Sequence, residues 1–351
     1  MEKVVVAMSG GIDSSVSAFL LKKSGYDVVG VTLNLFSGKN IKCCGSEDSV
    51  EKFKRICNHL GIRYYVKNAV KVFNEKVIDK FASDYLKGFT PNPCVECNRF
   101  LKFDYLFKIA KSLGASKLAT GHYAIVEKKG DEYVLKRGID DTKDQSYFLY
   151  PIKKEFLKDM LFPLGRMKKN EVKEIAKKNG IPLDINKESK DICFVPEGDY
   201  ALWLKKNGYV RNLQGYFKDM DGKIIGTHSG YFKYTVGQRK GLGVSGKERM
   251  YVVKINPLKN EVTLGVLKDC YFRKILIKDI NWMSSKTPES GEVLFAQIRY
   301  RHKPARGIIE YKDKDAEFVF DEPQFALTPG QSAVFYDGDR VMGGGAIVEA
   351  F

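Results

Sequence analysis

The sequence predicts an α/β protein in which a doubly wound parallel-sheet domain precedes a small β-rich central domain and a C-terminal β-barrel. An apolar, β-branched run at residues 4–8 predicts a buried parallel strand, and a glycine turn and a helical pattern follow it. Strand and helix patterns alternate along the first third of the chain, whereas short strands and turns dominate after residue 198. A chain of 351 residues also exceeds one typical domain. We therefore expect domains at residues 1–197, 198–272 and 273–351.

The turn after the first strand, Ser9-Gly10-Gly11-Ile12-Asp13-Ser14, predicts an anion-binding site. Its glycines allow a tight turn and a close approach of the backbone to a ligand. The helix that follows would point its N–H groups and the positive end of its dipole at the same place. Because the turn contains no lysine, it is not a phosphate-binding loop of the Walker type.

The other elements of the first domain follow in order. Strand patterns at residues 28–35, 62–66 and 117–120 alternate with helical patterns at 49–60, 72–86 and 100–113. A strand–helix–strand unit of this length predicts right-handed parallel crossovers. Ser9, Leu33 and Gly121 then fall at the carboxyl ends of strands, where open α/β sheets bind ligands, so one nucleotide could touch all three. A hairpin at residues 124–137 and a lysine-rich helix at 168–178 complete the domain.

The last two domains are predicted from short strand patterns separated by turns. In the central domain these patterns lie at residues 223–226, 231–236, 250–255 and 261–264. In the C-terminal domain they lie at residues 293–300, 307–311, 317–320, 332–336 and 345–348. Five or six short strands in about eighty residues predict a small barrel.

The net charge and the cysteine content restrict which partners and which cellular compartment are expected. The net charge of +16 favours an anionic partner, most often nucleic acid, although a lysine-rich proteome would give the same excess. Apolar runs long enough to span a membrane are absent, and the chain enters a strand at once, which leaves no signal peptide. The seven cysteines are an odd number. We therefore expect a cytoplasmic protein whose cysteines act as thiols or ligands.

Two of the cysteines form a motif with chemical meaning. Cys94 and Cys97 follow a proline-rich turn at a predicted helix start, where the helix N-terminus favours a thiolate, so such a cysteine is a nucleophile candidate. The C-x-x-C pair could also be half of a zinc site, but the chain offers only the adjacent Cys43 and Cys44 to complete it. Cys193 lies in an apolar context, which by itself is more typical of a core residue.

A second motif, Arg299-Tyr300-Arg301-His302, alternates aromatic and cationic side chains. This pattern suits stacking on bases combined with contacts to phosphate. Alternate residues of a strand face opposite sides, so the four side chains are not all expected to touch one ligand.

Taken together, the motifs resemble the tRNA-specific 2-thiouridylase family (MnmA/TrmU), whose first domain has the adenine nucleotide alpha-hydrolase-like fold of PP-loop ATP pyrophosphatases. The resemblance covers nearly the whole chain and rests on S-G-G-I-D-S, N-P-C-V-E-C-N, T-G-H-Y-A, K-D-Q-S-Y-F-L, D-I-C-F-V, Y-T-V-G-Q-R-K-G-L-G, R-Y-R and P-G-Q. It implies a sulfurtransferase that adenylates the C2 oxygen of the wobble uridine in tRNA for Lys, Glu and Gln. Sulfur then replaces this oxygen, which gives 2-thiouridine, AMP and pyrophosphate.

The resemblance also assigns residues to roles. ATP would be held by Ala7, Met8, Ser9, Gly10, Gly11, Ile12, Asp13, Ser14, Leu33 and Gly121. The tRNA would contact Asn92, Pro93, Cys94, His122, Lys143, Asp144, Gln145, Arg299, Tyr300 and Gln331, the first three of them at the target base, while the basic β domains grip the stem. Cys193 would carry the persulfide and Cys97 would be the nucleophile, able to form a disulfide with Cys193 after the sulfur leaves.

One position departs from the family pattern, since many members have Asp where this chain has Cys94. Cys94, Cys97 and Cys193 could then form a catalytic pocket of three thiols that holds an iron–sulfur cluster carrying the extra sulfur. The persulfide route remains the leading expectation.

The resemblance further implies Mg²⁺ with ATP, a sulfur donor such as a cysteine desulfurase or a persulfide relay protein, and no membrane partner. Two other functions stay open on the sequence. One is a different PP-loop enzyme, either another tRNA thiolase or an ATP-dependent amidating ligase, although a ligase would not need a reactive cysteine pair. The other is a non-catalytic RNA-binding scaffold, which would bind tRNA without cleaving ATP.

Overall fold

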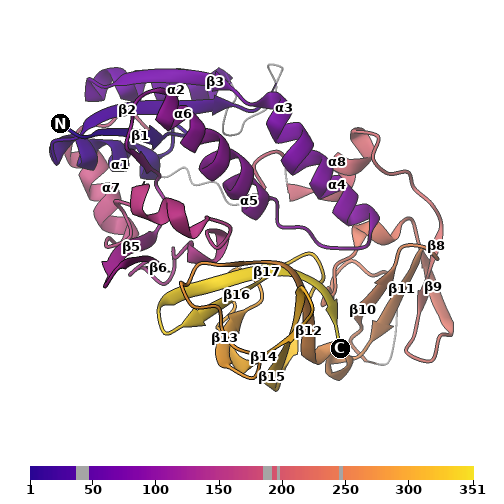
Figure 1. The fold of residues 1–351 in the computed structure, drawn as a ribbon. Coiled ribbons are helices and arrows are strands. Elements are labelled where there is room, and N and C mark those ends of the chain that lie inside the picture. The colour runs from indigo at the N-terminus through magenta and orange to yellow at the C-terminus, as the bar shows by residue number, and fades with distance from the viewer. Residues whose placement is uncertain (37–46, 185–191, 196–197, 245–247) are drawn as a thin grey trace.

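The computed structural model describes the whole chain except residues 37–46, 185–191, 196–197 and 245–247 (Figure 1). Three sheets organise it: a five-stranded sheet, a four-stranded sheet, and an eight-stranded sheet that contains the C-terminal barrel. The predicted order of an α/β domain, a small β-rich domain and a barrel is therefore confirmed. No helix within the described ranges is both long and apolar enough to cross a membrane.

The first sheet is entirely parallel and has the order β3-β2-β1-β4-β7. Its strands are β1 (Lys3–Ala7), β2 (Asp27–Asn34), β3 (Arg63–Asn68), β4 (Lys117–Ala119) and β7 (Met160–Leu161). β1 lies in the middle because Val4, Val5 and Val6 are completely buried and fill both faces of the sheet. The strand order reverses between β1 and β4, which is where open α/β sheets bind their ligands.

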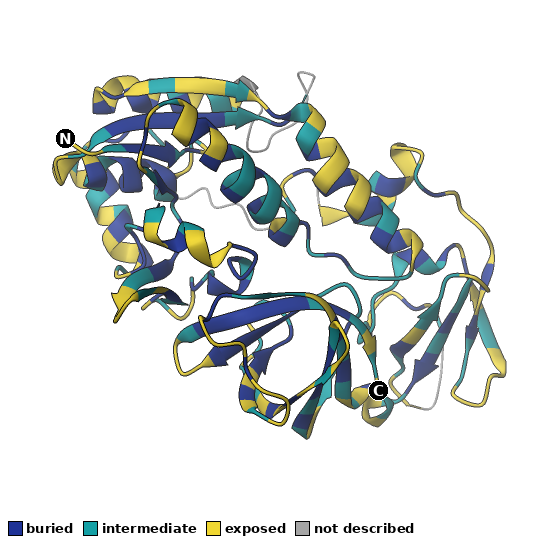
Figure 2. Cartoon of the chain, viewed as in Figure 1, coloured by how far each residue is buried: buried dark blue, intermediate teal, exposed yellow. Residues whose placement is uncertain are grey.

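Helices cover both faces of the parallel sheet, as a doubly wound domain requires. The helices α1 (Ile12–Lys23), α2 (Glu47–Leu60) and α7 (Lys169–Lys178) share a core with Val4 and Val6. On the opposite face, α6 (Leu106–Ser112) packs with Val5. The inner strands β1 and β2 are largely buried, whereas the edge strand β3 and the outer sides of the helices are exposed (Figure 2).

Two helical runs between β3 and β4 contain inserted π-helical turns. The π-helical segments are Asn74–Ile78, which joins α3 (Val70–Phe73) to α4 (Asp79–Leu86), and Cys97–Tyr105, which joins α5 (Pro93–Glu96) to α6. Such segments occur frequently at functional sites. The second run begins at Pro93, whose fixed φ and missing N–H suit the first position of a helix.

The central sheet has the order β10-β11-β8-β9. Its strands are β8 (Gly215–Lys218), β9 (Ile224–His228), β10 (Tyr251–Asn256) and β11 (Glu261–Gly265). The strand expected at residues 231–236 is wrong, since a 3₁₀ turn occupies Tyr231–Lys233. Phe232 packs into the core around the short helix α8 (Tyr200–Lys206), whereas Tyr234 packs on the central sheet. One extended strand cannot reach both cores.

The C-terminal barrel consists of six antiparallel strands and closes where β12 pairs with β17. The strands are β12 (Tyr271–Trp282), β13 (Val293–Gln297), β14 (Ala305–Lys312), β15 (Asp315–Phe325), β16 (Ser332–Asp337) and β17 (Arg340–Ala350). Ile275, Phe318, Phe320 and Phe335 are completely buried in its interior. A barrel of this size is filled by the side chains of its own strands.

The predicted hairpin of the first domain is present as β5 (Ala124–Lys129) and β6 (Glu132–Arg137), but it extends the sheet of the barrel. Lys136 of β6 pairs with Arg340 of β17, and the Arg340 guanidinium donates to Glu132 at 2.7 Å. The first domain and the barrel thus share one sheet, which fixes their relative position.

Candidate active site

The turn between β1 and α1 is shaped to expose backbone N–H groups. Gly10 has φ = 77°, which a side chain would strain, and a β-carbon there would lie 3.0 Å from the Ser49 carbonyl oxygen. The Ser14 hydroxyl accepts from Ser9 N at 3.2 Å and donates to Gly11 O at 3.1 Å, which holds the turn closed. Gly11 is the N-cap and supplies no side chain to the first N–H groups of α1. These groups are therefore directed at a site for an anion.

Three strand ends meet at this turn. Gly121, just after β4, packs so closely on α1 that a β-carbon there would lie 2.7 Å from Asp13 C and from Ser14 N. Leu33 lies near the end of β2 and is half-buried. The side chains of Met8 and Ile12 are buried in the core behind the turn, so only their main chain can face a ligand. Ala7 ends β1 and packs against the opposite core.

The carboxylate of Asp13 is held by two residues that sequence analysis missed. Lys169 on α7 donates to both of its oxygens, at 2.6 and 2.8 Å, and the Tyr123 hydroxyl donates at 2.8 Å. Both partners are buried. No local sequence pattern predicts these contacts. Lys169 lies 156 residues from Asp13, in a segment whose sequence predicts only a lysine-rich helix.

Cys94 and Cys97 lie one helical turn apart, at α5 and at the start of the π-helical segment Cys97–Tyr105. Cys94 is exposed and Cys97 is half-buried. Cys97 packs against the same apolar cluster as Ile192 and Phe194, the two neighbours of the exposed Cys193, and Leu33 also packs on this cluster. The cluster therefore connects both cysteine motifs with the carboxyl end of β2.

The described cysteines carry reduced thiols, so the expected disulfide between Cys97 and Cys193 is not present in this structure. No three His, Cys, Asp or Glu side chains in the described part of the chain are grouped closely enough to hold a metal ion. Cys94, Cys97 and Cys193 thus do not form the three-thiol ligand set considered for an iron–sulfur cluster. Cys43 and Cys44, the other ligands considered for zinc, lie outside the described residues.

His122 is buried beside Gly121, between Lys102 and Thr120. Its Nδ1 lies 2.7 Å from Thr120 Oγ1, and its Nε2 lies 3.3 Å from the ammonium nitrogen of Lys102 on the π-helical segment. Burial, and then the charge of Lys102, lower the pKa of His122 well below its ordinary value. The imidazole is therefore neutral, and its Nε2 can accept a hydrogen bond from Lys102.

Asp144 and Gln145, which belong to the predicted tRNA contacts at residues 143–145, make hydrogen bonds within the protein. Asp144 is buried and accepts from Arg137 at 3.0 Å, while Gln145 exchanges hydrogen bonds with the backbone of Tyr123. Lys143 is half-buried. Arg137 also donates to Gln297 of the barrel at 2.8 Å, so the segment lies at the junction between the first domain and the barrel.

The predicted contacts from the barrel lie at the same junction. Arg299 donates to the Phe325 carbonyl at 2.9 Å and is half-buried. Tyr300 packs on Phe148 with ring centroids 4.7 Å apart. Gln331 donates to the Thr90 carbonyl at 2.9 Å, just before Asn92 and Pro93. These last two residues line a cavity of about 290 Å³ between the α4–α5 turn and strands β12 and β17.

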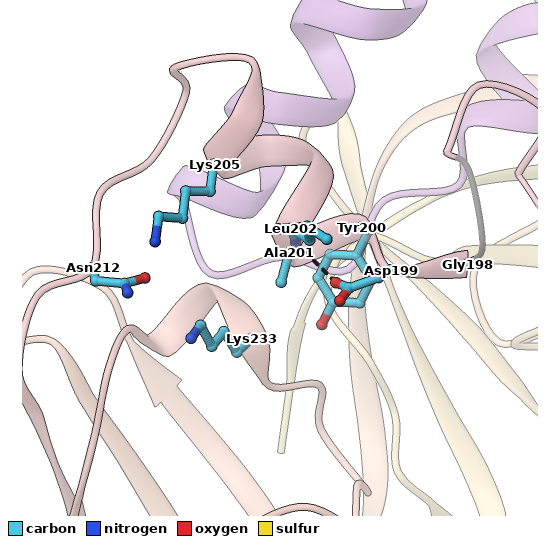
Figure 3. Close-up of a pocket in the computed structure, with 8 residues that line it drawn as sticks. All are labelled: Gly198, Asp199, Tyr200, Ala201, Leu202, Lys205, Asn212 and Lys233. Carbon is cyan, nitrogen blue, oxygen red and sulfur yellow. Dashed lines mark hydrogen bonds between the residues drawn. The ribbon is translucent and has the colours of Figure 1, made fainter. Parts of the chain in front are cut away.

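A larger pocket, of about 590 Å³, lies at the start of α8 (Figure 3). Lys205, Asn212 and Lys233 line one side of it, and Tyr200 and Asp199 line the other. The Asp199 carboxylate is turned back onto Leu202 N at 2.8 Å, so the two ammonium groups give the pocket a cationic side. No local sequence pattern indicates this pocket, because its residues come from separate places in the chain, at 198–205, 212 and 233.

Family models and relatives together match nearly the whole chain. Family models match residues 2–197 as a tRNA methyl transferase HUP domain, 204–266 as a tRNA methyl transferase PRC-barrel domain and 272–347 as an aminomethyltransferase beta-barrel domain. The chain is 45% identical to tRNA-specific 2-thiouridylase MnmA of Clostridioides difficile, over 99% of this chain and 98% of that protein. It is 45% identical to the same enzyme of Carboxydothermus hydrogenoformans, over 99% and 97%. A solved 4-thiouridine synthetase–RNA complex with bound ATP covers 60% of this chain and 50% of its own, at 21% identity and a TM-score of 0.35, too low to support a shared function.

Proposed function

Because the chain belongs to the tRNA-specific 2-thiouridylase (MnmA) family of sulfurtransferases, we propose that its site adenylates the wobble uridine of tRNA with ATP and then replaces the C2 oxygen by sulfur. One observation carries this proposal. The anion-binding turn, the end of β2 at Leu33 and the apolar cluster shared by both cysteine motifs lie at the same edge of the parallel sheet. An activating nucleotide and an attacking sulfur would therefore reach the same base.

In the first step, the uridine C2 oxygen attacks the α-phosphorus of ATP. The bond from the α-phosphorus to the bridging oxygen breaks, pyrophosphate leaves with the electron pair, and the uridine N3 proton is lost to solvent. This step is needed because a carbonyl oxygen is a poor leaving group, whereas an adenylated oxygen leaves as AMP. The turn from Ser9 to Ser14 would bind the pyrophosphate through backbone N–H groups at the start of α1, and Leu33 and Gly121 would border the nucleotide.

In the second step, the terminal sulfur of a Cys193 persulfide attacks C2 and AMP departs with the former uridine oxygen. Attack of the Cys97 thiolate on the Cys193 sulfur then breaks the S–S bond and releases 2-thiouridine. An external thiol reductant returns both cysteines to the reduced state that the structure records. The exposure of Cys193 suits this role, because a donor protein has to reach it to load the persulfide.

We assign the tRNA to the face that includes Asn92, Pro93, Cys94 and Lys143 of the first domain and Arg299 and Tyr300 of the barrel. A wobble base must be splayed out of the anticodon loop to reach Cys94, so the phosphates of the stem need separate contacts. The net charge of +16 supports this grip. The tRNA species for Lys, Glu and Gln, a cysteine desulfurase or persulfide relay protein as donor, a cytoplasmic location and the three domain boundaries given above are parts of the same proposal.

An iron–sulfur cluster and Mg²⁺ are the two metal groups that the resemblance raised. The three thiols do not fit an iron–sulfur cluster, since they form no ligand group in the described part of the chain, and no step of the proposal uses one. Magnesium would arrive bound to the phosphates of ATP. The acidic residue of the turn, Asp13, already accepts three hydrogen bonds from Lys169 and Tyr123, so we assign it no ligand role.

The test separates activation from sulfur transfer. The Cys193→Ser variant, given tRNA, ATP and a persulfide donor, should release pyrophosphate but form no 2-thiouridine, and its affinity for tRNA should stay close to that of the wild type. Cys270→Ser changes a buried cysteine at the end of the 3₁₀ turn Leu267–Cys270, just before β12; it is the control and should form 2-thiouridine normally. Formation of 2-thiouridine by Cys193→Ser would contradict the assigned role.

A further inference from the structure

Two lysines from later segments are connected to the turn of residues 9–14, which contains none of its own. Lys169 contacts Asp13 directly, and Lys102 contacts His122, whose neighbour Gly121 packs on the turn. Lys169 comes from α7, and Lys102 comes from the π-helical segment Cys97–Tyr105. Departure of pyrophosphate builds negative charge, and fixed cations directed at such charge contribute strongly to catalysis. The surroundings of the two lysines decide which of them can supply this charge.

Lys169 is neutralised by its partner. Its ammonium donates to both oxygens of Asp13, and its side chain is only 9% exposed. The pair as a whole carries no net charge, so it offers little attraction to phosphate. Lys169 instead fixes the Asp13 carboxylate, together with the Tyr123 hydroxyl.

Lys102 is held by a neutral group. Its ammonium lies 3.3 Å from His122 Nε2, and no carboxylate in the described ranges lies within ion-pair distance of it. Burial keeps the pKa of His122 low, so the imidazole accepts from the ammonium without cancelling its charge. Because Lys102 occupies Nε2, the ring proton is on Nδ1, where Thr120 Oγ1 accepts it at 2.7 Å.

Lys102 is connected to the anion site through His122 and Gly121. His122 directly follows Gly121, and Gly121 is the residue that packs on Asp13 and Ser14 at the start of α1. The segment that carries Lys102 also begins at Cys97, and it is π-helical, a conformation often retained for function. The same segment therefore carries a thiol at its first residue, Cys97, and a cation within it, Lys102, next to the residues that follow β4.

We propose that Lys102 is a catalytic residue of the adenylation step, with its ammonium bound to phosphate oxygens of ATP at the start of α1, and that His122 positions it. The inference rests on the proposed function. As uridine O2 bonds to the α-phosphorus and the bridging P–O bond breaks, Lys102 stabilises the charge on the leaving pyrophosphate. It thus replaces the lysine that a Walker-type loop carries within its own sequence. His122, assigned by resemblance to tRNA contact, acts here through Lys102.

The experiment measures tRNA-dependent release of pyrophosphate from ATP by the full chain. Lys102→Met should lower kcat by about 100-fold or more, in line with the loss of one preorganised donor. Lys102→Arg, which keeps the charge, should recover part of this loss. Lys108→Met removes an exposed lysine from the following helix and should leave kcat within about twofold of the wild type. All four proteins should bind tRNA with similar affinity.

The positioning role of His122 has its own readout. His122→Leu removes the acceptor for Lys102 and should lower kcat, whereas the double variant His122→Leu/Lys102→Met should be no slower than Lys102→Met alone. Residues that act through one group are non-additive in this way. Additive losses would show that His122 acts independently of Lys102.

The outcomes separate the inference from the function on which it rests. If the wild type releases no pyrophosphate in the presence of tRNA, the proposed function fails. If the wild type is active and Lys102→Met is equally active, only the assignment of Lys102 fails. If Lys102→Met loses both tRNA affinity and activity, Lys102 has a structural role, and the assignment is also overturned.

Discussion

The close packing of Gly121 on the start of α1 makes the substitution Gly121→Ala a direct probe of the nucleotide site. The new β-carbon would lie 2.7 Å from Asp13 C and Ser14 N, which is about 0.7 Å short of ordinary contact with two backbone atoms. Backbone atoms cannot turn away as a side chain can, so α1 must move relative to β4. Overpacking of this kind costs about 1–3 kcal/mol. A displacement approaching 1 Å of the groups that position a substrate can cost about 100-fold in rate.

The assay is the steady-state kinetics of tRNA-dependent pyrophosphate release as a function of ATP concentration. We expect kcat/KM for ATP to fall by about 10-fold to 100-fold in Gly121→Ala, with tRNA affinity unchanged. Gly222→Ala is the control, because Gly222 has φ = 83° in open space on the β8–β9 turn. It should lose about 1 kcal/mol of stability through backbone strain and keep its kinetics. Normal ATP kinetics in Gly121→Ala would refute the placement of the nucleotide at α1.

Substitutions at three further residues test contacts of the site. Lys169→Met removes the ammonium that pairs with Asp13 and should lower the free energy of unfolding in urea by about 1–3 kcal/mol. This loss is smaller than for a fully buried ion pair, because the Asp13 side chain is 34% exposed. The same variant should raise KM for ATP, and Lys169→Arg should recover part of the stability and part of the ATP affinity. Arg137→Ala leaves the buried Asp144 without its cation and should lower the free energy of unfolding by about 3 kcal/mol. An unchanged midpoint of urea unfolding would contradict the structural role of Arg137. Arg299→Ala should weaken tRNA binding and reduce the slope of log affinity against log salt by about 1, and an unchanged slope would exclude a phosphate contact.

The first domain was largely predictable because its signals are local. The buried run at residues 4–8, the glycine turn and the helix after it are each encoded within a few residues, and β1, the turn and α1 follow that order. The strands β2, β3 and β4 were predicted for the same reason. β7 was missed because it has only two residues, Met160 and Leu161, and thus no periodicity.

The central domain and the barrel were predicted as β-rich domains, but some of their strands were missed. β8 was missed because it has four residues and begins at Gly215, where a β-carbon would lie 2.2 Å from the Asn260 carbonyl oxygen. β12 was missed because its alternation of buried and exposed side chains is interrupted near Asp279, which has φ = 53° and lies within the register shift between Lys278 and Asn281 in the pairing with β17. Interruptions of this kind are invisible to a search for period two.

The contacts that define the site depend on pairings between distant segments. The hairpin β5–β6 was predicted, but its addition to the barrel depends on Arg340, 204 positions beyond Lys136. Lys169 reaches Asp13 and Lys102 reaches His122 in the same way, across gaps that no local pattern spans. Residue types and motifs could therefore be identified from the sequence, whereas their electrostatic partners required the fold.

The central claim is tested most directly by mass spectrometry of nucleosides from tRNA incubated with the purified wild-type protein, ATP and a persulfide donor. The account predicts that uridine at the wobble position gains sulfur and becomes 2-thiouridine, only when ATP is present, with one pyrophosphate released for each base converted. Two results would contradict the account: uridine that stays unmodified although ATP has been cleaved to pyrophosphate, or 2-thiouridine that forms at the same rate without ATP.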